Sequence, residues 1–230
     1  MKKLSMTITL FISLTLTFPL PSHALSFTYS FLARSTENVI RPISPDQPPA
    51  LSNTDALKIF LKPGKNTYIY LFLHDAEGGL SLLFPEKISD LDCCYRFNTP
   101  YSYPPGDEWT GFGETGGTEQ FILLVSDTRL DTLEDLTAYY MEKFALYWKN
   151  PGKKSVEQEM AEARYAVLDR IRHIRLEHSD FTNIKERLVI IAGEFRNADE
   201  EVTGITVIAE GFYGKTIRIE HKRLVGEKEK

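Results

Sequence analysis

Hydrophobic and polar residues alternate with a period of two just after the N-terminal region. Phe27, Tyr29 and Phe31 are separated by serine and threonine, which indicates a strand with one apolar face. Four prolines follow between positions 42 and 49, and proline interrupts both helices and central strands. We therefore predict an extended linker that ends near residue 53.

Short apolar runs continue through the first half of the chain. The run at 67–74 is apolar on both faces, so we expect it to lie centrally in a sheet. Gly78 and Gly79 follow it and allow the positive φ angles of a hairpin turn. The strands predicted in this half are 56–61, 67–74, 80–84, 95–97 and 121–126.

The hydrophobic period becomes helical in the second half. Leu136, Tyr140 and Phe144 share one face of a helix predicted over 131–147. Ser155 begins a capping-box pattern for a second helix. Its apolar stripe favours a helix that covers a sheet over a zipper that binds a partner; the stripe consists of Val156, Met160, Ala163, Val167, Ile171 and Ile174. Three further strands are predicted at 187–195, 205–210 and 215–222.

The N-terminus predicts export. Lys2 and Lys3 precede a charge-free stretch over 4–20, and Ser22-His23-Ala24 resembles a cleavage site. We expect a signal peptide removed after Ala24, the alternatives being an uncleaved anchor or a buried helix. No later segment reaches about 18 apolar residues, so no stable membrane span is expected after cleavage. The expected location is periplasmic or secreted.

Helices and strands are segregated along the chain, which favours an α+β fold. We expect a mainly antiparallel, sandwich-like β structure with two helices in the second half. The expected organisation is a signal peptide at 1–24, a strand and proline-rich linker at 25–53, a β-rich domain at 54–147, a helix with antiparallel strands at 148–222 that shares the same core or stands apart, and a charged tail at 223–230.

Composition and charge narrow the classes of function to be considered. The chain is 42% hydrophobic and 26% charged, as in globular proteins, and its formal charge of −5 gives no reason to expect nucleic-acid binding. Cys93 and Cys94 are its two cysteines. We expect two partly buried thiols, with a vicinal disulfide or an intermolecular bridge as the alternatives.

Part of the chain resembles a bacterial family known only as domain of unknown function 4384. The resemblance spans about residues 53–135, and it rests on the motifs YIYLF at 68–72, DAEGG at 75–79, LLFP at 82–85, PPGDE at 104–108, GTE at 117–119 and the run 121–126. Members of the family are exported, envelope-associated or attached to other domains, including caspase-like peptidases. The resemblance implies an accessory or interaction module and carries over no catalytic residue.

The sequence predicts no catalytic residue, cofactor or metal site. His173 and His178 are five residues apart, not the four that place two ligands on one helix face. The chain contains no H-E-x-x-H, C-x-x-C or Walker motif, and no serine lies in a nucleophile elbow.

Aromatic residues concentrate on a loop rich in proline and glycine, over 95–117. Rings on a stiff loop lose little entropy on binding and favour sugar faces or protein partners. The alternative is that several rings fill the end of the sandwich. The candidate binding residues are Tyr101, Tyr103, Asp107, Glu108, Trp109 and Phe112.

We therefore expect a non-enzymatic binding or interaction module of the cell envelope, with an envelope protein or a glycan as its partner. One alternative is a hydrolase of cell-wall or extracellular polymers with acids near Asp107 and Glu108. Another is a structural component of a secreted assembly.

Overall fold

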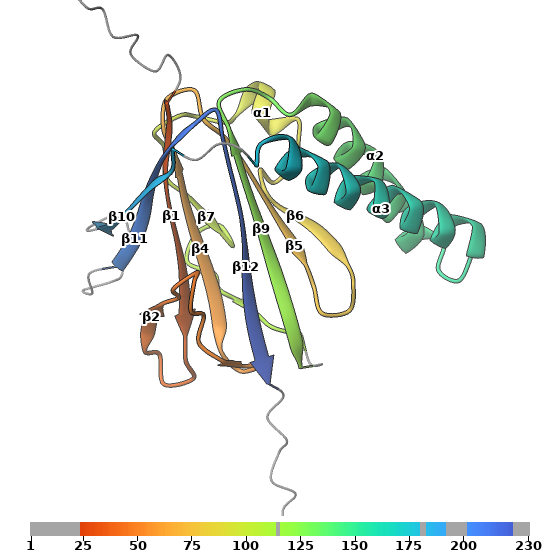
Figure 1. Ribbon diagram of the computed structural model, residues 1–230. Helices are drawn as coiled ribbons and strands as arrows, with labels where there is room; N and C mark the ends of the chain where they lie inside the picture. The colour runs from red at the N-terminus through yellow and green to blue at the C-terminus, as the bar shows by residue number, and fades with distance from the viewer. Residues whose placement is uncertain (1–23, 114–115, 180–182, 192–201, 223–230) are drawn as a thin grey trace, which may run out of the picture.

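The protein consists of two β-sheets packed face to face, with two helices on the outer face of one sheet (Figure 1). The computed structural model describes residues 24–113, 116–179, 183–191 and 202–222. The predicted signal peptide thus lies almost wholly outside the described residues. The α+β class and the two helices of the second half are confirmed.

The first sheet has the strand order β10-β11-β1-β4-β7. Two short strands pair with it off this path, β2 with β1 and β8 with β4. The bounds are β10 (Lys185–Ile191), β11 (Val202–Glu210), β1 (Ala24–Arg34), β4 (Ala56–Pro63), β7 (Tyr101–Tyr103), β2 (Ile40–Pro42) and β8 (Thr110–Gly111).

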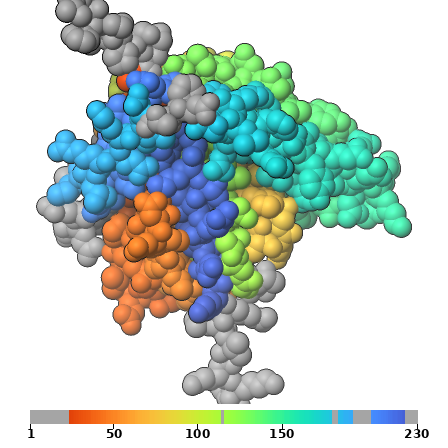
Figure 2. All heavy atoms as spheres, in the orientation of Figure 1, coloured from red at the N-terminus to blue at the C-terminus, as the bar shows by residue number. Residues whose placement is uncertain are grey.

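The second sheet has the order β3-β12-β9-β5-β6. Its neighbours are antiparallel except β3 and β12, which are parallel. The bounds are β3 (Leu51–Ser52), β12 (Phe212–Lys222), β9 (Gly117–Ser126), β5 (Tyr68–His74) and β6 (Leu80–Phe84). In Figure 2 the blue C-terminal strand lies between the orange N-terminal segment and the green strand, so distant parts of the sequence share this sheet.

The main core lies between the sheets. The predicted apolar face of β1 is confirmed, because Phe27, Tyr29 and Phe31 are all buried in it. The ring of Phe27 lies 5.2 Å from that of Tyr213 on β12, and the ring of Phe31 lies 5.4 Å from that of Phe121 on β9. These edge-on contacts join the two sheets.

A second core lies between the second sheet and the helices α2 (Asp131–Lys149) and α3 (Lys154–Glu177). The predicted stripe of α3 covers the sheet, with Val167 and Ile171 among its buried residues. Strand β5 is apolar on both faces because Ile69 belongs to the inner core and Tyr70 to this outer one. Its predicted central position is confirmed.

Three predictions of local structure need correction. Residues 95–97 form no strand and instead follow the short helix α1 (Asp90–Cys93). The ring of Tyr95 packs against other rings at the main core, which explains the apolar pattern that resembles a strand. The predicted linker contains β2 and β3, and Ile43 in its middle is only 4% exposed. Helix α3 begins without a side-chain cap, so the capping box at Ser155 does not form. Residues 192–195 of the strand predicted at 187–195 lie outside the described residues.

Candidate functional site

The aromatic loop follows one open side of the sandwich. On this side β6 forms the edge of one sheet and β7 forms the edge of the other. The rings of Phe84 on β6 and Tyr101 on β7 lie 4.9 Å apart. Two hollows open along this side, and Tyr103 contributes to the lining of both.

The larger hollow, which we call the β6–β7 groove, has a volume of about 400 Å³. Its walls are mostly apolar and aromatic, with two carboxylates. The lining residues are Leu82, Leu83, Phe84, Pro85, Glu86, Asp90, Cys94, Tyr95, Tyr101, Ser102, Tyr103 and Pro105.

The tyrosine hydroxyls of this groove are partly engaged inside the protein. Tyr95 Oη donates to the carbonyl oxygen of Thr67 at 2.7 Å and accepts from the amide of Ile69 at 3.2 Å. Tyr101 Oη accepts from the amide of Arg96 at 2.6 Å. Burial raises the pKa of Tyr95 and of Tyr103. These residues therefore present ring surface, more than free hydrogen-bonding groups, to the groove.

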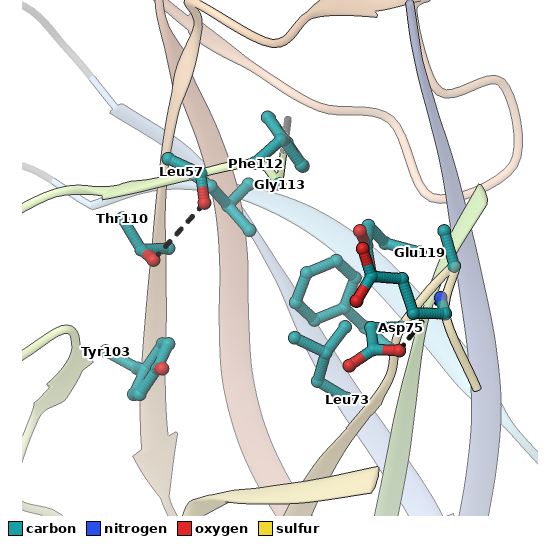
Figure 3. A pocket seen from close by; sticks show the side chains of 12 residues that line it. Leu57, Leu73, Asp75, Tyr103, Thr110, Phe112, Gly113 and Glu119 are labelled. Carbon is teal, nitrogen blue, oxygen red and sulfur yellow. Dashed lines mark hydrogen bonds between the residues drawn. The ribbon is translucent and has the colours of Figure 1, made fainter. Parts of the chain in front are cut away.

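The smaller hollow, which we call the acidic pocket, has a volume of about 230 Å³. It lies where β5 and β9 of one sheet face β4, β7 and β8 of the other. Figure 3 shows Asp75 and Glu119 on one side of it and Tyr103 and Thr110 on the other. Its apolar lining residues include Leu57, Leu73, Phe112 and Phe121, and its third carboxylate belongs to Glu77.

The hairpin between β5 and β6 positions Asp75. Asp75 Oδ1 accepts from the amide of Glu77 at 3.0 Å and from the amide of Gly79 at 2.6 Å. Gly78 completes the turn with a φ of 83°, which glycine adopts without strain. The turn thus fixes a carboxylate at the edge of the pocket.

Glu119 and His221 form a buried pair beside the pocket. Both side chains lie on the inner faces of the neighbouring strands β9 and β12, because Glu119 alternates with the core residue Phe121 and His221 with the core residue Ile219. His221 Nε2 lies 3.1 Å from Glu119 Oε1, and the two residues are 2% and 7% exposed. The ring of Phe112 stacks on the imidazole with centroids 4.9 Å apart.

The pair is incompletely satisfied. Glu119 Oε2 and His221 Nδ1 are buried without a hydrogen-bond partner among the described residues. Burial raises the pKa of the Glu119 carboxyl, and the nearby charge of Asp75 adds to that rise, whereas the contact with His221 and the backbone amide of Ala76 oppose it. A carboxylate that lacks a partner at one oxygen is able to accept a hydrogen bond from a ligand.

The structure distributes the sequence-predicted binding residues unevenly. Tyr101 and Tyr103 line the groove, and Tyr103 and Phe112 line the acidic pocket. The remaining three, Asp107, Glu108 and Trp109, line neither hollow. A binding role for these three stays a prediction.

Lysine and arginine side chains hold the segment that contains Trp109. The guanidinium carbon of Arg34 lies 4.6 Å from the centre of the Trp109 ring, and Lys58 Nζ lies 5.9 Å from it. Lys58 Nζ also donates to the carbonyl oxygens of Gly106 and, at 3.1 Å, Glu108. These contacts attach the loop to β1 and β4.

Glu119, His221 and Asp75 were not among the predicted site residues. One signal was available, because His221 shares its strand face with the apolar residues Ile217 and Ile219. The pairing itself joins residues 102 positions apart. It depends on the register of β9 against β12, which the sequence pattern does not specify.

The cysteines differ from the prediction of partly buried thiols. Cys93 and Cys94 are bonded to each other in a vicinal disulfide, and both are exposed. They end the short helix α1, which has no buried residue. Cys94 contributes to the lining of the β6–β7 groove.

Comparison with known proteins supports the resemblance. Residues 51–129 match the model of a family described as a domain of unknown function (DUF4384). The matched segment contains every residue that lines the groove and the acidic pocket, but not His221. No curated protein and no solved structure matches the chain. Within the described residues, no helix has the length and apolar character needed to cross a membrane.

Proposed function

We propose that this protein is an exported, non-enzymatic binding module of the bacterial cell envelope. Its β6–β7 groove binds an extended segment of a partner protein. The observation that carries the proposal is an apolar groove between the edge strands of two sheets.

The two edges suit an extended peptide. Among the described residues, β6 pairs only with β5, and β7 pairs only with β4. A peptide that lies along a sheet edge uses its backbone for hydrogen bonds and inserts alternate side chains into pockets. The rings of Phe84, Tyr101 and Tyr103 offer apolar surface for such side chains.

The chemistry of the groove favours a peptide over a glycan. A sugar presents many hydroxyl groups, and each one needs a hydrogen-bond partner when it is buried. Tyr95 and Tyr101 already use their hydroxyls inside the protein. No observation favours the hydrolase alternative, because Asp107 and Glu108 are exposed and line neither hollow.

Binding to the groove is testable with a peptide library. We expect peptides selected on the purified protein to be extended, with apolar residues at alternate positions. Ser102→Glu places a charge in the groove, and we expect it to weaken these peptides at least about tenfold, which corresponds to about 1.4 kcal/mol. Ser155→Glu, the same substitution at an exposed position on α3, is the control and should leave affinity unchanged. Equal losses in both variants, or no selected peptide, would contradict the proposal.

Export is testable by intact mass. The order of Lys2 and Lys3, a charge-free stretch and Ser22-His23-Ala24 supports cleavage after Ala24. Cleavage there removes only Ala24 from β1, and Leu25, the next residue of the strand, pairs with Ala209 of β11. The native protein should have the mass of a chain that begins at Leu25 and should be found outside the cytoplasm. A native chain that keeps Met1 in the membrane fraction overturns this part of the proposal.

A further inference from the structure

The acidic pocket holds a buried carboxylate that the rest of the protein leaves half satisfied. Glu119 is 7% exposed and lines the pocket, and its Oε2 has no hydrogen-bond partner among the described residues. Leaving a buried charged atom unpaired is costly, because the protein interior does not replace the lost hydration. The Glu119 carboxylate therefore favours a ligand that brings a hydrogen-bond donor into the pocket.

The other charged residues that line the pocket are also acidic. Asp75 and Glu77 contribute two more carboxylates, and no lysine or arginine is among the described residues that line the hollow. The hydrogen bond between His221 and Glu119 involves Oε1, the other carboxylate oxygen. Figure 3 shows the carboxylates of Asp75 and Glu119 close together on one side of the hollow. A ligand with a positive charge is the complement of this side.

The arrangement suits an organic cation better than a metal ion. In the described chain, the one group of His, Cys, Asp and Glu residues with ligand atoms close enough to share a metal is Asp90, Cys93 and Cys94, away from this pocket. Metals such as Ca²⁺ and Mg²⁺ need several oxygens converging at about 2.0–2.6 Å from the ion. The carboxylates of the acidic pocket do not converge in that way.

The opposite side of the pocket offers surface for carbon atoms. Leu57, Tyr103 and Phe112 contribute apolar and aromatic groups there. We infer that the acidic pocket binds an organic ammonium ion, with the ammonium group at Glu119 and Asp75 and the carbon body against this apolar side (Figure 3). An ammonium group has three donors and suits several carboxylates at once.

The ammonium group has two sources in this chemistry. One is a small free amine. The other is a lysine side chain of a bound protein segment, because Tyr103 borders both the acidic pocket and the β6–β7 groove. The lysine source rests on the proposed function, whereas the free amine does not.

The decisive experiment uses the unmodified protein and three probes of similar shape. These are 2-phenylethylammonium, the neutral 2-phenylethanol and the anionic 3-phenylpropanoate, each titrated while amide NMR signals are followed. We expect the cation to shift the amides of Ala76, Gly111 and Gly113 and to bind at least about tenfold more tightly than the alcohol. Equal affinity for cation and alcohol, or no binding of the cation, overturns the inference.

A variant assigns the selectivity to the buried carboxylate. Glu119→Gln keeps the size of the side chain and removes its charge, so we expect at least about a tenfold loss of affinity for the cation and little change for the alcohol. Glu220→Gln removes an exposed carboxylate from the neighbouring strand β12 and serves as the control. If Glu119→Gln fails to fold, the probe series on the unmodified protein still decides the inference.

The two sources are distinguished by a fourth probe, Nα-acetyl-lysine N-methylamide. Tighter binding of this probe than of 2-phenylethylammonium assigns the pocket to a lysine side chain, and the reverse order assigns it to a free amine. The phenyl probes contain no peptide backbone and do not need the groove. Failure of the groove to select peptides therefore leaves the cation test intact.

Discussion

At the scale of single residues, the buried pair of Glu119 and His221 is the most unusual feature of the described chain. Both side chains lie on inner strand faces that are mostly apolar. Glu119 completes one side of the acidic pocket, and Phe112 stacks on His221. The buried Glu119 carboxylate costs stability, because the interior only partly replaces the hydration that it loses on folding.

The burial of Glu119 predicts that the free energy of unfolding depends on pH. Burial raises the pKa of this carboxyl in the folded protein, so the folded state keeps the proton to higher pH than the unfolded state. The free energy of unfolding therefore decreases as pH rises through that interval. Glu119→Gln has no proton to lose there, so its stability relative to the wild type should increase with pH.

Chemical denaturation from about pH 3 to about pH 8 checks this expectation. The difference should be smallest below the ordinary glutamate pKa, should grow between that value and the raised pKa of folded Glu119, and should stay constant above it. Glu220→Gln, which removes an exposed carboxylate, is the control. A stability difference between Glu119→Gln and the wild type that stays constant with pH contradicts the assignment of the raised pKa.

A second prediction at this scale concerns the cysteines. Cys93 and Cys94 are exposed and joined to each other, so their bond closes almost no chain loop in the unfolded state. Replacing both by serine should change the free energy of unfolding by no more than about 0.5 kcal/mol, as for other surface substitutions. Urea denaturation measures this change. A loss of about 2 kcal/mol or more, typical of removing a long-loop disulfide, contradicts it.

At the scale of elements, a polar cluster attaches α2 to the sheet. Glu134 in the first turn of α2 is 3% exposed and accepts hydrogen bonds from the hydroxyl of Tyr70 on β5 and from Arg129. Arg129 also donates to Asp92 on α1 at 2.6 Å. The cluster therefore joins α1, α2 and β5 at one end of the second core.

Removing Glu134 should loosen this attachment. Glu134→Ala leaves the Arg129 guanidinium and the Tyr70 hydroxyl without their shared acceptor, so we expect a loss of about 3–5 kcal/mol in the free energy of unfolding. The same substitution at exposed Glu142 on the same helix should cost no more than about 0.5 kcal/mol. Equal, small losses at both positions would show that the cluster contributes little.

At the scale of the whole molecule, the N-terminal and C-terminal strands complete both sheets. Strand β1 lies between β4 and β11 in one sheet, and β12 lies between β3 and β9 in the other. The family match over 51–129 includes β4 and β9 but neither β1 nor β12. The segment 51–129 by itself therefore lacks one neighbour of each of its two longest strands, β4 and β9.

This arrangement predicts that the segment 51–129 does not fold alone. Without β1 and β12, the inner faces of β4 and β9 lose their apolar cover and both strands become open edges, which aggregate readily. Far-UV circular dichroism and amide NMR of the segment should show no native β structure, whereas a chain over 25–230 should unfold cooperatively. A dispersed NMR spectrum from the isolated segment contradicts the prediction.

The sequence by itself determined most of the strands, the two long helices and which of their faces are buried. The period of two in β1, the apolar run of β5 and the helical stripe of α3 each report which faces are buried, because burial acts on every residue of an element. It also placed Tyr101, Tyr103 and Phe112 among the candidate binding residues, and the structure finds all three at the hollows.

Only the tertiary structure decided which strands meet. Insertion of β12 between β3 and β9 brings His221 to Glu119, and the β5–β6 hairpin brings Asp75 to the same pocket. Whether two strands pair depends on how both sheets pack around a shared core, so no local sequence pattern encodes the pairing. For the same reason Tyr95 and Phe97, which resemble a strand in sequence, contribute their rings to a cluster beside the groove.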